Sequence, residues 1–355
     1  MDSNVYIPKR EYKVLVRCYT YNHSIYIEDA LNGFAMQQTD FPFVCLVVDD
    51  CSTDGEQNVI KEWMSRECDM QCSEIYEDNT AYMVLIPHKT NSNCDFAFYF
   101  LKENLHKQKD RKRAYVEPWR KKCEYEAMCE GDDYWIVRDK LLRQIHYMDS
   151  NPNCLLSFTD VNNKNEKNGK IIRSFLHSGI PHVPKNFEDH LINNGYMAPC
   201  TWVYRISCLK FYEKMSHVDG TFAMSLDIFA NGDVYFEDSV TSVYRSLPES
   251  ASHFRNKKKL YNYVKGVFKT KCIYIERYKV SEDIIRIVKE RYYSQALPYI
   301  LLFEDLEDSK RDAILYSKNI CPKSLKLKIT LLLSKSKYTR LLLNLIYNIL
   351  WYYKN

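Results

Sequence analysis

Short apolar runs recur through the first half of the chain, and each is followed by a polar stretch and an amphipathic segment. The runs predict buried strands at Val14–Val16, Phe43–Val48, Met83–Ile86, Ala127–Cys129 and Leu155–Phe158. Apolar positions at helical spacing predict helices at Ile27–Ala35, Asn58–Cys68, Phe96–Leu105 and Leu141–Met148. Uninterrupted apolar strands that alternate with helices predict an α/β fold, a mostly parallel sheet with helices on both faces. In such sheets ligands bind at the carboxyl ends of the strands.

The pattern becomes less regular after residue 164. It predicts helices at Phe187–Asn194 and Phe222–Phe229 and strands at Trp202–Tyr204 and Val240–Arg245. After Phe254 the chain turns basic and helical, beginning with three consecutive lysines at 257–259. We therefore expect an α/β domain over residues 1–255 and a helical, basic and amphipathic C-terminal region over residues 256–355.

Composition narrows the class of protein. The 355 residues carry a net charge of only +4, so a nucleic-acid partner is not expected. Thirteen cysteines follow a polar start, Met1–Arg10, that has no apolar signal core, which favours reduced thiols in the cytoplasm. Cys68 and Cys72 have no second pair at zinc-finger spacing. No apolar run reaches the roughly 20 residues that span a bilayer.

Two acidic clusters directly follow predicted strands. They are Asp49-Asp50 and Glu130-Gly131-Asp132-Asp133. If both strands belong to one parallel sheet, the carboxylates meet at one edge and repel each other unless a cation lies between them. Mg²⁺ or Mn²⁺ bound to a diphosphate is the natural candidate, because hard cations take oxygen ligands. Loop residues or helix caps would explain either cluster alone, but the pair favours a binding site.

Three ordered segments between Lys13 and Phe254 carry a resemblance to a known family. They are Tyr19–Asn22 with Val47–Asp54, Cys129–Trp135 with Asp139–Leu141, and Arg245–His253. They resemble the opening, the metal-binding motif and the closing motif of family 2 inverting glycosyltransferases, including bacterial enzymes that build surface polysaccharides. The resemblance implies a GT-A fold and transfer of a sugar from a nucleotide sugar. UDP is the commonest donor nucleotide in that family.

The resemblance also implies roles for individual residues. Those expected to bind the nucleotide sugar are Thr20, Tyr21, Asn22, Asp49, Asp50, Glu130 and Asp132. Those expected to bind a divalent metal, Mn²⁺ or Mg²⁺, are Asp132, Asp133 and His253. Glu130 stands where the family more often has an aspartate. In glycosyl transfer the metal stabilises the negative charge that develops on the leaving diphosphate.

The catalytic base is where the sequence departs most from the family. Inversion requires a carboxylate that takes the proton of the acceptor hydroxyl, and Thr221 stands at the position expected to hold it. Asp219, in the loop before the predicted helix, and Asp227, within that helix, are the two candidates. The expected acceptor contacts, for which packing in the core is an equally good explanation, are Tyr134, Trp135, Thr201 and Trp202.

The last part of the chain combines basic and apolar residues. Cys321–Arg340 contains six basic residues and no acidic ones, and apolar runs follow at Leu341–Leu343 and Ile349–Tyr353. This pattern predicts either a helix at an anionic membrane surface or a helix that packs on protein. A glycan or lipid-linked saccharide acceptor at the inner face of the plasma membrane would suit the membrane interpretation.

Two other functions remain open at this point. A nucleotidyltransferase normally has a glycine-rich phosphate loop after its first strand, and Tyr19–Ile25 contains no glycine. A non-catalytic nucleotide-sugar binder or assembly scaffold is supported by Thr221 in place of the expected base.

Overall fold

The computed structural model describes residues 6–212, 217–247 and 257–303, together with Leu342 and Leu345. These residues form two compact units. Described residues within Met1–Asn186, Gly195–Glu213 and Asp227–Pro248 make the first unit, and those within Phe187–Asn194, Lys214–Leu226 and Glu249–Asn355 make the second.

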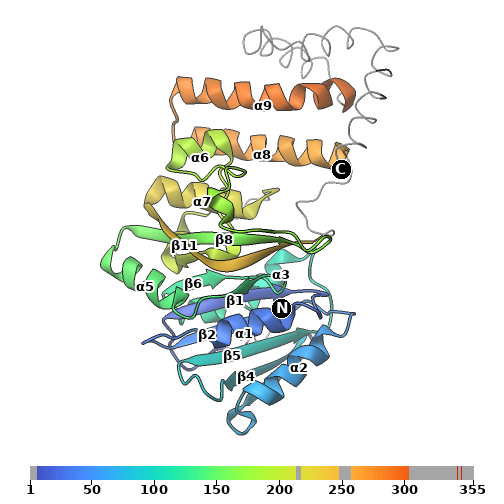
Figure 1. Ribbon diagram of the computed structural model, residues 1–355, viewed down its shortest axis with the longest axis vertical. Coiled ribbons are helices and arrows are strands. Elements are labelled where there is room, and N and C mark those ends of the chain that lie inside the picture. Colours follow the sequence, from blue (N-terminus) through green and yellow to red (C-terminus); the bar gives the residue numbers. More distant parts are fainter. Residues whose placement is uncertain (1–5, 213–216, 248–256, 304–341, 343–344, 346–355) are drawn as a thin grey trace. The chain divides into compact units, whose positions relative to one another are not determined.

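The first unit is built on one sheet, which has eleven strands among the described residues. Its parallel centre has the order β5-β2-β1-β6, formed by β1 (Val14–Thr20), β2 (Phe43–Asp49), β5 (Cys94–Leu101) and β6 (Tyr125–Met128). β1, β2 and β6 lie side by side in Figure 1. The predicted α/β fold is confirmed; the sheet as a whole is mixed, and the predicted parallel pairing holds for its central strands.

Further strands extend this centre on both sides. β4 (Ala81–Pro87) pairs antiparallel with β5, and β3 (Glu74–Glu77) pairs with β4. On the other side β10 (Val203–Arg205) runs antiparallel to β6 and joins it to β8 (Cys154–Asn165). β8 also pairs with β11 (Asp233–Ser246) and β9 (Ile171–Ile172), and β7 (Tyr134–Trp135) pairs with the other side of β11.

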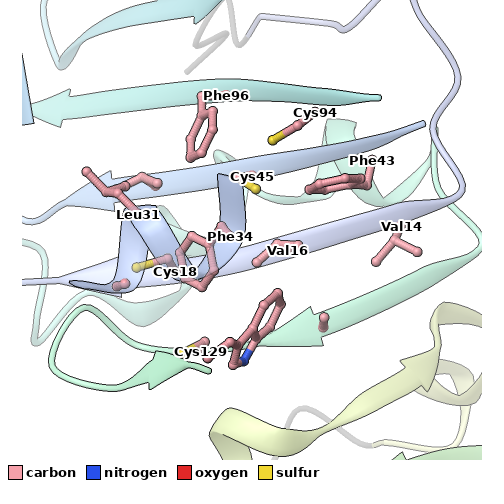
Figure 2. Packing of buried hydrophobic residues seen from close by; sticks show 14 of the residues in the cluster. Val14, Val16, Cys18, Leu31, Phe34, Phe43, Cys45, Cys94, Phe96 and Cys129 are labelled. Carbon is pink, nitrogen blue, oxygen red and sulfur yellow. The ribbon is translucent and has the colours of Figure 1, made fainter. Parts of the chain in front are cut away.

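Helices cover both faces of the sheet because successive strand residues point to opposite sides. Val16 of β1 lies in a core with Leu31 and Phe34, whereas Leu15 lies in a second core with Trp119. Figure 2 shows the first core, in which several cysteine side chains pack among the apolar ones. The helices on the first face are α1 (Ile27–Ala35), α2 (Glu56–Glu67) and α5 (Lys140–Ser150). The short helices after β5 are α3 (Lys109–Ala114) and α4 (Glu117–Arg120).

The predicted helix at Phe96–Leu105 is wrong, because most of this segment is the buried strand β5. Phe96, Phe98 and Phe100 alternate along it and stack on one face, with 5.3 Å between the ring centroids of the first two. A continuous apolar run of this length suits a strand covered on both faces as well as a buried helix, so the pattern alone was ambiguous.

The second unit is helical. It contains α6 (Phe187–Asn193), the beginning of α7 (Gly220–Asn231), α8 (Lys257–Arg277) and α9 (Glu282–Phe303). Phe268 of α8 stacks on Tyr292 of α9 with 3.8 Å between ring centroids. The Tyr274 hydroxyl donates to the Ala223 carbonyl at 2.8 Å, which fastens the start of α7 to α8. Two earlier stretches of the chain thus belong to the same unit as α8 and α9.

The structure gives limited information on the predicted closing motif and on the C-terminal segment. His253 and the basic, apolar segment from Cys321 to Tyr353 lie outside the described residues, apart from Leu342 and Leu345. Within the described ranges no helix is both long and apolar enough to cross a membrane. Short 3₁₀ turns lie at Met70–Cys72, Phe175–His177, Pro199–Thr201 and Ile206–Lys210.

Candidate active site

The register of the central strands brings two of the three resembling segments, Tyr19–Asn22 with Val47–Asp54 and Cys129–Trp135, to one edge of the sheet. Thr20, the last residue of β1, pairs with Asp49, the last residue of β2. On the other side of β1 the chain leaving β6 continues alongside it, and the Gly131 amide donates to the Tyr19 carbonyl at 3.1 Å. The predicted juxtaposition of Asp49-Asp50 with the turn Glu130–Asp133, here called the acidic turn, is therefore present.

Gly131 lets the acidic turn lie directly on Thr20. A Cβ atom at this position would be 2.1 Å from Thr20 Oγ1 and 2.7 Å from Thr20 Cβ. Any side chain at residue 131 would therefore displace Thr20 or the turn.

The carboxylate of Glu130 is paired with a cation of the chain itself, Arg17. Its Oε2 accepts from the Tyr19 amide at 3.1 Å, and its Oε1 lies 3.4 Å from Arg17 Nη1. Arg17 is buried, and its Nε also pairs with Glu126 at 2.6 Å. Glu126 pairs with Arg120 at 2.6 Å on its other side. Burial alone would raise the pKa of Glu126, but the two guanidinium groups lower this pKa to about 2.

Asp50 also has protein partners in this structure. Its Oδ1 accepts from the Leu105 amide at 2.7 Å, and its Oδ2 pairs with Lys112 Nζ at 2.5 Å. Its carbonyl accepts from Asn104 Nδ2 at 3.0 Å. The segment that follows β5 therefore closes over this buried carboxylate.

Asp49 is buried beside Asp50 but is less completely bonded. Its Oδ1 accepts from the Ser52 amide at 3.1 Å and from Gln57 Nε2 at 2.5 Å. Its Oδ2 is buried without a hydrogen-bond partner among the described residues. A buried oxygen of this kind costs free energy unless a ligand group or water reaches it.

Asp132 differs from the other carboxylates at this edge. It is partly exposed, and in the described part of the chain no side chain or amide donates to its carboxylate. Its neighbour Asp133 is buried, and Asp133 Oδ1 accepts from the Arg245 amide at 2.8 Å. Burial and the adjacent Asp132 raise the pKa of Asp133. Asp132 is therefore the carboxylate best placed to receive a cation from solvent.

No metal site is complete within the described ranges, since no group of three or more His, Cys, Asp or Glu side chains converges there.

Arg245 supplies positive charge next to the acidic turn. Its guanidinium is buried, donates to the Asp132 carbonyl at 2.8 Å, and pairs with Asp29 and with Glu166. It lies 4.3 Å from the ring centroid of Tyr134. Arg245 therefore ties the acidic turn to neighbouring elements.

The two loops that follow β1 and β2 are bonded to each other. Asn22 has a left-handed backbone with φ 58°, its amide donates to Ser52 Oγ at 3.0 Å, and its side chain accepts from the Thr53 amide at 2.8 Å. Tyr21, between Thr20 and Asn22, is 43% exposed. An exposed aromatic ring beside a polar loop can stack on a planar ligand.

The residues predicted to contact the acceptor are mostly in the core. Trp135 is buried, donates from Nε1 to the Cys200 carbonyl at 2.7 Å, and contacts Phe34. Thr201 and Trp202 are buried as well. Of the four, Tyr134 alone is partly exposed.

The two candidate bases have different surroundings. Asp219 belongs to the second unit, where its Oδ1 accepts from the Thr221 hydroxyl at 2.7 Å and the Phe222 amide at 3.0 Å. Its Oδ2 accepts from the Tyr263 hydroxyl at 3.0 Å. Asp219 therefore caps α7, as aspartates before helices commonly do. Asp227 belongs to the first unit and is buried within α7.

Sequence reasoning did not single out Arg17, Lys112 or Glu56. Arg17 had a signal, since it is a charged residue inside an apolar strand run, and such a residue needs a buried partner. Lys112 lies in a polar segment, where a lysine gives no signal in the sequence. Glu56 directly follows the turn Ser52–Gly55 and begins α2, where an acidic residue is common enough to pass unnoticed.

Comparison with known proteins supports the fold. The structure of Staphylococcus aureus TarS residues 1–349 matches with a TM-score of 0.51 and 17% identity, over 87% of this chain and 81% of that one. A longer S. aureus TarS structure matches with a TM-score of 0.51 and 16% identity, over 94% of this chain and 52% of that one. The GT-A-like fold that the sequence predicts is confirmed by this similarity.

Sequence relatives cover less of the chain. Uncharacterized proteins of Mycobacterium tuberculosis and Mycobacterium bovis are 32% identical over 142 residues, which is 40% of this chain and 33% of each relative. The match thus spans about a third of the length of these curated relatives. No family model matches the chain.

Proposed function

We propose that this chain is an inverting glycosyltransferase, which moves a sugar from a nucleoside-diphosphate sugar to an acceptor hydroxyl. The observation that carries the proposal is the acidic turn, which is seated on Thr20 and leaves the Asp132 carboxylate partly exposed without a donor from the described residues. The GT-A-like fold and the junction of the Asn22 and Ser52 loops at the same edge support it.

The donor would bind across this edge. Tyr21 offers an exposed ring for the base, and Asp49 offers the buried oxygen that has no partner in the described part of the chain. Lys112, bonded to Asp50, brings an ammonium group to the same edge, where it would favour a diphosphate. The complete proposed donor set is Thr20, Tyr21, Asn22, Asp49, Asp50, Glu130 and Asp132.

The residues of the acidic turn fit a divalent cation in part. Asp132 would hold Mn²⁺ or Mg²⁺, and Asp133, the second proposed ligand, is buried and would have to turn toward the cation. When bound, such a metal would neutralise charge on the leaving diphosphate. His253, the third proposed ligand, lies outside the described residues.

The acceptor side is proposed from chemistry alone. Asp219 is our first choice of base and Asp227 the second, since inversion needs a carboxylate that accepts the acceptor's proton. Tyr134, partly exposed beside the acidic turn, is the acceptor contact that needs least rearrangement. We further propose a UDP-sugar donor and a role in bacterial capsule, O-antigen or exopolysaccharide synthesis. The acceptor would be a glycan or lipid-linked saccharide that the chain meets in the cytoplasm, at the inner membrane face.

The alternative is a nucleotide-sugar binder or scaffold without catalysis. The specific observation in its favour is that both oxygens of Asp219 are engaged by residues of the second unit, while Thr221 replaces the expected base. An enzyme would release nucleoside diphosphate from its donor, by transfer or slow hydrolysis, and a scaffold would not.

The test is a binding and turnover screen of purified protein with UDP-, GDP- and dTDP-sugars, with and without Mn²⁺. A rise in melting temperature for one donor that requires Mn²⁺ and disappears in Asp132→Asn supports the proposed site, because a ligand of the folded state alone stabilises it. Release of the diphosphate in the same mixture supports catalysis. Binding without release in the presence of candidate acceptors would support the scaffold, and no binding of any donor would contradict both.

A further inference from the structure

Glu56 is a buried carboxylate at the edge of the sheet where β1 and β2 end, which is the edge proposed to bind the donor and is here called the donor edge. It is the first residue of α2, and its side chain has no exposed surface. A buried carboxylate is costly unless hydrogen bonds surround it. Its stability in the fold therefore depends on the groups that donate to it.

The donors to Glu56 come from two separate loops. Its Oε1 accepts from the Thr20 hydroxyl, and its Oε2 accepts from the His23 amide at 2.9 Å. Oε2 also accepts from the Ser52 hydroxyl at 2.8 Å. One carboxylate thus joins the loop after β1 to the loop after β2.

Both of these loops contain backbone that ordinary residues seldom adopt. Asn22 has φ 58° and Cys51 has φ 62°, both in the left-handed region. Such conformations persist only where surrounding bonds determine them. Since Ser52 Oγ accepts from the Asn22 amide and donates to Glu56, the carboxylate supports the residues next to both strained positions.

The effect of Glu56 extends to the acidic turn through Thr20. The Thr20 hydroxyl oxygen that donates to Glu56 is the same atom that would lie 2.1 Å from a Cβ of Gly131. A Thr20 side chain released from Glu56 could rotate into the acidic turn. Three segments assigned to the donor therefore depend on this one carboxylate.

We infer that Glu56 is a positioning residue, which fixes the loops that bind the donor without contacting the donor itself. The inference rests on the proposed function for its consequence, the affinity for nucleotide. Its structural half, the ordering of the two loops, stands apart from any ligand.

The experiment compares Glu56→Ala and Glu56→Gln with Asp95→Ala as a matched control. Asp95 is also a buried carboxylate, with the Tyr12 hydroxyl donating to it at 2.7 Å and Arg10 at 2.9 Å. It pairs with Val44 near the start of β2, at the end of the parallel strands opposite the donor edge. It therefore controls for loss of a buried carboxylate without loss of the loop bonds.

Two measurements are made below the melting temperature of every variant. Affinity for UDP, GDP and dTDP is measured by calorimetry with Mn²⁺, and amide hydrogen exchange is measured without ligand. We expect the Kd to rise at least tenfold in Glu56→Ala, at least threefold in Glu56→Gln, and less than twofold in Asp95→Ala. The amides of Asn22, His23 and Thr53 should exchange at least tenfold faster in Glu56→Ala only.

The outcomes separate the inference from the function. Equal affinity loss in Glu56→Ala and Asp95→Ala would overturn the positioning role, as would unchanged affinity in both Glu56 variants. If Glu56→Ala does not fold, Glu56→Gln decides by the threefold criterion. If the wild type binds none of the three nucleotides, the proposed function fails, and exchange decides alone: faster exchange confined to Glu56→Ala sustains the inference, and equal exchange in all variants refutes it.

Discussion

Replacing Glu126 with glutamine should destabilise the first unit, which contains the sheet (here called the sheet unit), by about 3 kcal/mol at pH 7. Glu126 is fully buried between Arg17 and Arg120, each with its Nε 2.6 Å from a carboxylate oxygen. The two guanidinium groups hold its pKa at about 2, against 4.5 for an ordinary glutamate. This difference corresponds to about 3 kcal/mol of stability, since each pKa unit is worth about 1.4 kcal/mol.

The ion pairs of Glu126 with Arg17 and Arg120 also make the free energy of unfolding depend on pH. Because the folded pKa of Glu126 lies below the unfolded one, its contribution is complete above pH 4.5 and is lost as pH falls toward 2. Wild-type stability should therefore fall more steeply than that of Glu126→Gln across this window. The two stabilities should converge near pH 2.

Urea unfolding followed by tryptophan fluorescence measures this, because Trp63, Trp119, Trp135 and Trp202 are buried in the sheet unit. The control is Glu124→Gln, whose ion pairs with Lys13 and Arg205 are about half exposed on the glutamate side. That change should cost less than about 1 kcal/mol. A loss below about 1 kcal/mol in Glu126→Gln, or parallel pH curves for Glu126→Gln and wild type, would refute the argument.

Three further changes test the donor edge. Gly131→Ala should cost about 1–3 kcal/mol in urea unfolding and weaken nucleotide binding, because its Cβ would lie 2.1 Å from Thr20 Oγ1; unaltered stability would contradict the contact. Asp132→Asn should abolish any Mn²⁺-dependent rise in melting temperature while leaving the ligand-free melting temperature within about 1 °C of wild type, since no described group donates to this carboxylate. Arg245→Met should cost about 3 kcal/mol by the same unfolding assay, because it leaves Glu166 without this partner and frees the acidic turn; a loss near zero would show that the pairs are not maintained in solution.

The sequence was informative where the signal was local. The strand β2 and the acidic residues after it could be predicted because an apolar run ends abruptly at Asp49. The same reasoning failed at β5, where a fully apolar segment matches a buried helix and a buried strand equally well. Its assignment depends on pairing with β2 and β4, and that pairing is a property of the tertiary fold.

The partners of the acidic residues could not be predicted in the same way. Arg17 meets Glu126 across a separation of 109 residues, and Lys112 meets Asp50 across 62. Both contacts depend on strand register and on the path of the segment after β5. A metal is the cation expected between the carboxylates from the sequence, whereas the chain supplies three cations of its own in Arg17, Lys112 and Arg245.

A protein that neutralises much of its own acidic edge does not depend on a ligand to assemble it. Arg17 already faces Glu130 and Lys112 already faces Asp50, so two of the carboxylates at the strand ends are paired with cations of the chain itself. A donor would then arrive at loops that are already ordered and would lose little affinity to ordering entropy. It would also leave without the edge collapsing, which is what repeated turnover requires of an empty site.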